Sequence, residues 1–210
     1  TASLLAAARA AGARRFVAQS YAGWPCAPTG GPVKTEEDDL DPDPPPRMRR
    51  TLAAIRELEA MVVGGGRAGG GDLAGLALRY GALYGPGTSL SRGGDIAEAV
   101  RKRRFPIVGS GAGVWSFLHI EDAASATLAA IERGSPGIYN VVDDEPAPVA
   151  TWLPALAEAL GAKPPRRVPT WVGLLAIGAA GISLMTRIRG ASNAKARREL
   201  DWQPAYRSWR

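Results

Sequence analysis

Apolar residues in this chain alternate between helical spacing and short uninterrupted runs, and this alternation most constrains the fold. Apolar residues three and four apart predict helices over 48–63 and 122–133. Short apolar runs bounded by Gly, Pro and charged residues predict strands, at 16–20, 73–79, 105–108, 117–120 and 138–142. Helices that alternate with strands favour an α/β fold with a largely parallel sheet.

Composition and residue counts bound the class of protein. The 210 residues match one domain or slightly more, at about 100–200 residues per domain. Hydrophobic residues make up 46% and charged residues 22%, proportions that argue against disorder and against a coiled coil. The single Cys26 and the single His119 exclude an internal disulfide and the zinc sites that need two Cys or two His. We therefore expect no metal site and a cytoplasmic location.

Three segments suggest functions that their surroundings argue against. The net charge of +6 and the basic run 101–104 indicate a solvated helix end rather than a nucleic-acid site. Gly64, Gly66 and Gly69 form the pattern G-x-G-x-x-G, but they follow a helix and precede a strand. We therefore expect a linker that ends the helix rather than a dinucleotide loop.

The uncharged residues 168–186 approach the length of a membrane span, but glycines interrupt them. A buried helix pair is therefore favoured, and membrane binding is not expected.

The histidine lies at the end of a predicted strand, just before a predicted helix. His119 is expected to hydrogen-bond near the helix N-terminus, and Asp122 to cap the helix. Ser20 lies in no G-x-S-x-G sequence, so a Ser–His triad with His119 is not indicated.

Five groups of residues, in a fixed order over most of the chain, carry a family resemblance. In order they are AARAAG with RRFVAQS (7–20), LRYGALYGPG (78–87), GAGVWSFLHIED (111–122), GIYNV (137–141) and AKARRELDWQP (194–204). Together they resemble the extended short-chain dehydrogenase/reductases, the NAD-dependent epimerase/dehydratase family. The resemblance implies a doubly wound Rossmann-type NAD(P)-binding domain with a smaller C-terminal α/β domain for the substrate.

The resemblance also implies a division of the chain. Residues 1–88 are expected to form the C-terminal half of the NAD(P)-binding domain, and 89–210 mainly the substrate domain, with a return to the Rossmann sheet. The resemblance begins just before the family's fifth strand. We therefore expect an N-terminally truncated protein that lacks the Gly-rich cofactor loop. A full-length form would bind NAD or NADP, whereas this chain alone would bind either weakly or not at all.

Particular residues take roles from the family's motifs. Ser20 matches the catalytic Ser/Thr position and would lie near the nicotinamide. Gly81 would let the backbone approach the nicotinamide, and Tyr84 would border the pocket. Trp24 and Trp115 would line the substrate side. Trp115 stands where nucleotide-sugar members often carry Arg, and an indole has no charge, so an apolar or aromatic substrate is favoured over a UDP- or dTDP-sugar.

The family's catalytic pair, Tyr-x-x-x-Lys, is missing from this sequence. Thr51 and Ile55 stand at its two positions, and no Tyr anywhere in the 210 residues has Lys four positions on. A phenol needs a nearby cation to act as a base at neutral pH. The sequence therefore resembles the atypical branch of the family. We expect an oxidoreductase or epimerase-like protein with a small-molecule substrate, for which a homodimer is one open arrangement; the alternative is a non-catalytic NAD(P)-binding sensor or scaffold.

Overall fold

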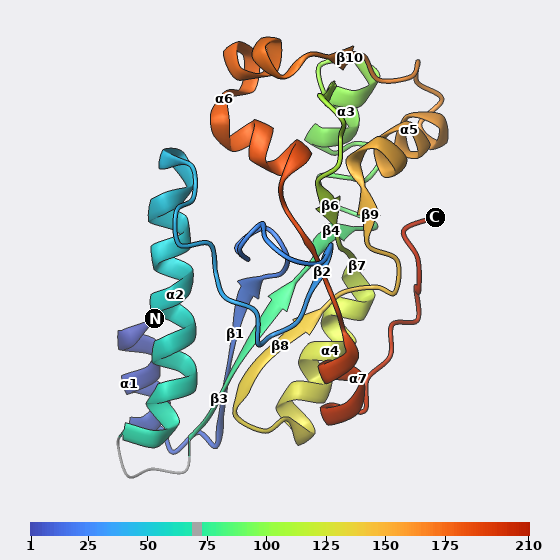
Figure 1. Cartoon of the computed structure of the whole chain (residues 1–210). Coiled ribbons are helices and arrows are strands. Elements are labelled where there is room, and N and C mark those ends of the chain that lie inside the picture. Colours follow the sequence, from blue (N-terminus) through green and yellow to red (C-terminus); the bar gives the residue numbers. More distant parts are fainter. Residues whose placement is uncertain (69–72) are drawn as a thin grey trace.

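A three-stranded parallel sheet lies at the centre of the computed structural model, which describes residues 1–68 and 73–210 (Figure 1). Its strands are β1 (Arg15–Tyr21), β3 (Ala74–Tyr80) and β8 (Gly137–Val141), in the order β1-β3-β8. The register sets Tyr21 beside Tyr80 at the carboxyl ends of β1 and β3. The predicted α/β fold with a parallel sheet is confirmed.

Helices cover both faces of this sheet (Figure 1). One face packs against α1 (Ala2–Ala10) and α2 (Pro46–Ala68), where Leu5, Val62 and Leu73 form a buried cluster. The other face packs against α4 (Ile120–Arg133) and α7 (Ala194–Glu199). Successive strand residues point to opposite faces, so each helix layer buries alternate residues of β1 and β3.

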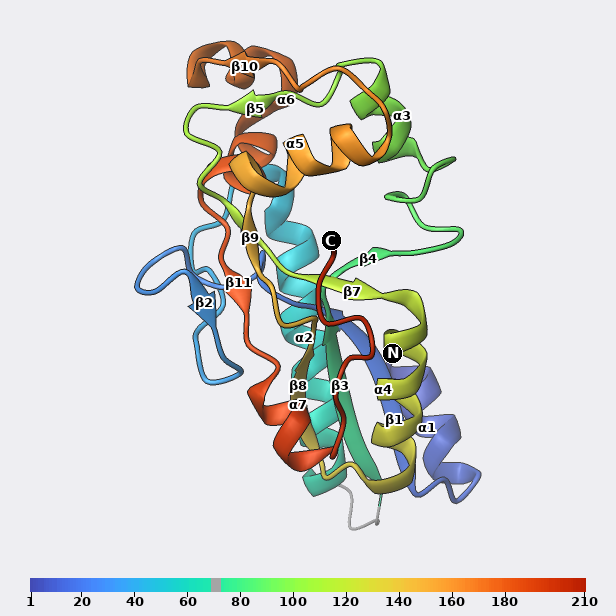
Figure 2. The ribbon, with the colours of Figure 1, turned by 90° about the vertical axis from the view of Figure 1, so that its right-hand side faces the viewer.

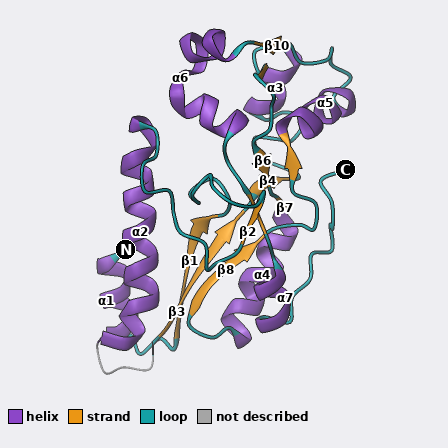
Figure 3. Ribbon diagram, in the orientation of Figure 1, coloured by secondary structure: helices purple, strands orange, loops and turns teal. Residues whose placement is uncertain are grey.

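A second hydrophobic cluster lies beyond the carboxyl ends of the sheet (Figure 3). Its helices are α3 (Asp95–Arg101), α5 (Val149–Ala159) and α6 (Thr170–Thr186). Trp152 of α5 lies at its centre with only 1% of its surface exposed, and its ring meets Phe117 at 5.6 Å between centroids. Phe117 and Trp152 each bury a large apolar area, which stabilises a cluster whose other buried members are not aromatic.

Short paired strands join the sheet to this second cluster (Figure 2). The parallel pairs are β2 (Val33–Lys34) with β11 (Gly190–Ala191), β4 (Ala82–Tyr84) with β7 (Phe117–His119), and β5 (Ile107–Val108) with β10 (Arg167–Val168). One pair is antiparallel, β6 (Val114–Trp115) with β9 (Ala147–Pro148). These pairs fix the segments that surround the candidate site.

The glycine pattern does not end α2. The helix continues through Gly64 and Gly66 to Ala68, so the predicted end of the helix at Gly64 is wrong. Gly69 lies outside the described residues. Gly64 and Gly66 therefore lie within the helix, and the string precedes β3, whereas a dinucleotide loop follows a strand and opens a helix.

The uncharged segment forms α6, which bends at Gly178, where φ is 67°. The predicted division into two helical pieces is therefore present, but the first piece is not buried. Trp171 is 68% exposed and Leu175 is 82% exposed. Within the described part of the chain, no helix combines the length and apolar character needed to cross a membrane.

Candidate functional site

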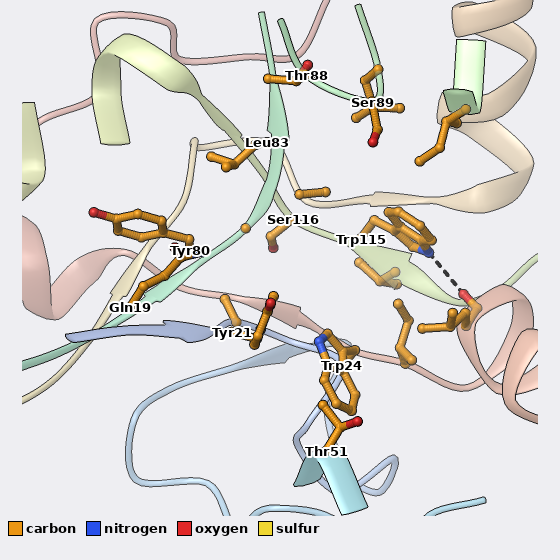
Figure 4. Close-up of a pocket in the computed structure, with 18 of the residues that line it drawn as sticks. Gln19, Tyr21, Trp24, Thr51, Tyr80, Leu83, Thr88, Ser89, Trp115 and Ser116 are labelled. Carbon is orange, nitrogen blue, oxygen red and sulfur yellow. Dashed lines mark hydrogen bonds between the residues drawn. The ribbon is translucent and has the colours of Figure 1, made fainter. Parts of the chain in front are cut away.

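A cavity of about 780 Å³ opens at the carboxyl ends of β1 and β3. Its wall combines aliphatic side chains with four aromatic ones: Tyr21, Trp24, Tyr80 and Trp115 (Figure 4). Ligands of open α/β sheets bind beyond the carboxyl ends of the strands, because the connecting loops diverge there. The position and the lining both make this cavity the candidate site.

Two aromatic residues that the sequence assigned to the substrate side lie in this wall. The Trp115 indole N–H donates to the Leu184 carbonyl at 2.9 Å, and its ring lies 4.9 Å from that of Trp152. Trp24 lies 6.0 Å from Tyr21 between ring centroids. Because the only polar atom of the Trp115 side chain is already bonded, that side chain presents an apolar surface to the cavity.

Ser20 lies on the opposite face of β1 from this cavity. It is 2% exposed, and its hydroxyl donates to a Glu59 carboxylate oxygen at 2.7 Å. Its neighbours Gln19 and Tyr21 line the cavity, whereas Ser20 does not. The geometry therefore does not support the role predicted for Ser20 beside a nicotinamide, because strand alternation turns its side chain toward α2.

Beneath the cavity, the same hydroxyl joins a buried ion pair. Arg79, which pairs with Ser20 in the register of β1 and β3, donates to the two Glu59 oxygens at 2.7 Å each. The side chains of Arg79 and Glu59 are 3% and 5% exposed. This ion pair connects α2 to the sheet. The spacing of residues in the sequence does not predict it, because 20 residues separate Glu59 from Arg79.

The two residues expected at the cofactor lie in different places. Gly81 lines the cavity, but a Cβ there would lie 2.8 Å from the Ser116 carbonyl oxygen, so backbone packing already requires glycine. Tyr84 lines a separate cavity of about 310 Å³. Its hydroxyl donates to the Ser208 carbonyl at 3.0 Å, and burial raises its pKa. The geometry therefore does not place Tyr84 at the border of the larger cavity.

Of the two residues that stand at the positions of the family's Tyr and Lys, only Thr51 faces the larger cavity. Thr51 lines the larger cavity, where Figure 4 shows it next to Trp24. Ile55 is 5% exposed and does not line the cavity. One position thus faces the candidate site, while the other packs in the interior.

At the start of α4, the hydrogen bond predicted for His119 is confirmed, whereas the role predicted for Asp122 is not. His119 occupies the cap position, and its Nδ1 accepts the Glu121 backbone N–H at 3.3 Å. Asp122 instead accepts the backbone N–H groups of Ala205 and Tyr206, at 2.8 and 2.9 Å. The predicted cap at Asp122 is therefore wrong: this carboxylate fastens the C-terminal segment. Among the described residues, no group of three His, Cys, Asp or Glu side chains is arranged to hold a metal ion.

A family model described as "NAD dependent epimerase/dehydratase family" matches residues 1–141. The chain belongs to this family. A curated relative, the "3-diazoavenalumate denitrifying reductase" of a Streptomyces species, is 48% identical over 211 residues, which cover 100% of this chain and 67% of the relative.

Solved structures of other proteins share the fold of this epimerase/dehydratase family member. MoeE5 with UDP-glucuronic acid and NAD gives a TM-score of 0.68 at 23% identity, over 96% of this chain and 63% of MoeE5. DesIV, a dTDP-glucose 4,6-dehydratase from Streptomyces venezuelae with NAD and DAU bound, gives 0.71 at 21%, over 96% of this chain and 58% of DesIV. The human epimerase family protein SDR39U1 with NADPH gives 0.70 at 18%, over 93% and 62%. At these identities the matches establish the fold.

A buried carboxyl near the end of β8 makes the stability of the protein depend on pH. Asp143 is 2% exposed; one oxygen accepts the Glu145 N–H at 3.2 Å, and the other has no partner in the described structure. Burial raises its pKa to about 7, and the negative charges of Glu145 and Asp144 add to the rise. Since an unfolded Asp titrates near 4, the folded state binds the extra proton between about pH 4 and 7.

We expect the Asp143 carboxyl to lower stability as the pH rises through that window, with little further change above pH 7. The Asp143→Asn variant cannot take up this proton. Its free energy of unfolding, relative to the parent protein, should therefore increase between pH 5 and pH 8 in urea titrations. An equal difference at both pH values would contradict the buried, protonated carboxyl.

Proposed function

We propose that this chain carries the substrate cavity of an NAD(P)-dependent reductase. One observation carries the proposal: a large cavity lined in part by four aromatic side chains opens at the carboxyl ends of β1 and β3 in a chain of the epimerase/dehydratase family. The 48% identity to a reductase supports reduction rather than epimerisation.

The proposal divides the chain into two working parts. Residues 1–88 would belong to the cofactor domain, and residues 89–210 mainly to the substrate domain. The return of β8 to the central sheet supports this division, as does the separate cluster around Trp152. The cavity draws residues from both parts, including Tyr21 and Trp115.

When bound, NAD(P)H supplies a hydride. The described residues fit only its nicotinamide end: Tyr21 and Tyr80 lie side by side at the ends of their strands, next to Gly81. The pyrophosphate needs a glycine-rich turn between a strand and a helix, and the string at Gly64 does not have that position. We therefore propose that a full-length form binds NAD or NADP.

Because the Tyr–Lys pair is missing, we favour a substrate whose reduction needs no proton from the protein. By analogy with its relative's name, we propose reductive loss of a diazo group. Hydride adds to the carbon that bears the diazonium group, the carbon–nitrogen bond breaks, and its electron pair leaves with N₂. Atoms and charge balance without an acid, so Thr51 and Ile55 in place of Tyr and Lys are no obstacle. The aromatic side chains of the cavity would contact the ring.

A non-catalytic NAD(P)-binding sensor or scaffold is the second candidate. The specific observation in its favour is Ile55, which is buried where the family carries its Lys. Such a protein would bind the cofactor but would not oxidise it.

The test gives the full-length protein NADH or NADPH deuterated on either face of C4, together with an aryl diazonium carboxylate. We expect one N₂ for each cofactor oxidised and deuterium at the carbon that lost nitrogen, measured by mass spectrometry. Cofactor binding without oxidation would support the sensor instead. Oxidation with nitrogen retained in the product would contradict diazo loss.

In calorimetry, the 210-residue chain alone should bind either cofactor with a dissociation constant above about 10 μM.

A further inference from the structure

The charges that line the larger cavity all have one sign. Of its described lining residues, only Arg47 and Arg189 are charged, and none is Asp or Glu. Arg47 comes from the first turn of α2, and Arg189 from the segment between α6 and β11. Low-dielectric walls concentrate the field of such charges, so the cavity attracts anions.

Both guanidinium groups have hydrogen-bonding capacity to spare. Arg189 is half-buried; its Nη2 donates to the Pro28 carbonyl at 2.7 Å, and its buried Nε has no partner in the described structure. Arg47 is exposed and also lines the cavity. Neither group forms an ion pair among the described residues. A guanidinium has five N–H donors in a planar fork that matches a carboxylate, so most of this capacity is open to a ligand.

Two tryptophans in the remaining wall offer flat apolar faces to an aromatic ring. Trp24 and Trp115 border the same cavity, and the Trp115 N–H is already bonded to Leu184. We infer that Arg47 and Arg189 bind the carboxylate of a conjugated aromatic acid, whose ring lies against the tryptophans. This inference deepens the proposed function, since it names the substrate class of the same cavity.

The experiment measures binding without any cofactor, so that its result is independent of the proposed reduction. Calorimetry compares cinnamate, a flat conjugated acid, with methyl cinnamate, which has the same ring and no charge. A charge-assisted hydrogen bond predicts about ten- to hundredfold tighter binding of cinnamate. UDP serves as the second anion, because guanidinium groups also bind diphosphates.

Variants assign the effect to the two arginines. Arg47→Met and Arg189→Met should each remove most of the preference for cinnamate over its ester. Arg50→Met and Arg187→Met are matched controls on the same segments, exposed and outside the cavity lining, and should keep that preference. Because Arg47 is exposed, its variant tests the inference even if Arg189→Met fails to fold.

Three outcomes would overturn the inference. Equal affinity for cinnamate and its ester would show that the cavity does not recognise the anion. An equal loss in Arg187→Met would show a diffuse effect of charge rather than a site. Tighter binding of UDP than of cinnamate, lost in both cavity variants, would assign the arginines to a diphosphate.

Discussion

Replacing Arg79 with Met is expected to lower the free energy of unfolding by about 3–5 kcal/mol, because the change leaves the Glu59 carboxylate buried without its cation. In the structure, the two Glu59 oxygens accept from Arg79 at 2.7 Å, and both side chains are almost fully buried. Among the residues that the structure describes, only the Ser20 hydroxyl would remain as a partner. Urea unfolding at pH 7, followed by circular dichroism, measures the loss.

Two further variants show whether the unpaired charge is the cause. Arg79→Met combined with Glu59→Leu removes both charges and should regain much of the lost stability, because two apolar side chains of similar size can replace a buried pair. Ser20→Ala removes one hydrogen bond to the carboxylate and should cost about 1–3 kcal/mol. A double variant no more stable than Arg79→Met alone would contradict this account.

Much of the fold follows from local patterns in the sequence. The helix predicted over 48–63 lies within α2, and the strand predicted over 73–79 overlaps β3, because helical spacing and apolar runs are local signals. The paired strands of two residues, such as β6 and β9, are too short to carry any periodicity. Their pairing depends on contacts between distant segments, which a single sequence does not reveal.

The candidate site could be predicted only in part. The resemblance assigned Trp24 and Trp115 to the substrate side, and both line the cavity. The role that it gives Ser20 stays a prediction; in the structure its neighbour Tyr21, and not Ser20, occupies the cavity face of β1. Strand alternation was the available signal for Tyr21. No sequence pattern predicts that Arg189 lines the cavity. It lies there because the segment after α6 packs against the loop after β1.

Restoring the family's missing Lys is expected to destabilise the protein rather than to activate it. Ile55 is 5% exposed and lies outside the cavity lining, so Ile55→Lys would bury an ammonium group. Glu59 lies one turn further along α2, but its oxygens already accept from Arg79 and Ser20. A depression of the Lys pKa by about three units corresponds to a loss of roughly 4 kcal/mol at pH 7.

The dependence on pH distinguishes a buried cation from a simple packing defect. The folded-state pKa of the new Lys lies below its unfolded value, so the unfolded state binds more protons between the two. The penalty should therefore shrink as the pH rises from 7 toward 10. Ile55→Met keeps a long apolar side chain and should show a small loss that is independent of pH.

The double variant then tests the link between this position and catalysis. Thr51→Tyr alone adds a phenol at the cavity wall and should fold, because Thr51 is exposed there. Thr51→Tyr with Ile55→Lys should unfold as readily as Ile55→Lys and should not turn over a generic carbonyl substrate with NADPH in the full-length protein. A stable double variant that reduces carbonyls would show that α2 can still present both side chains to the substrate. In that case, the missing Tyr–Lys pair would reflect the substrate and not the packing of this helix.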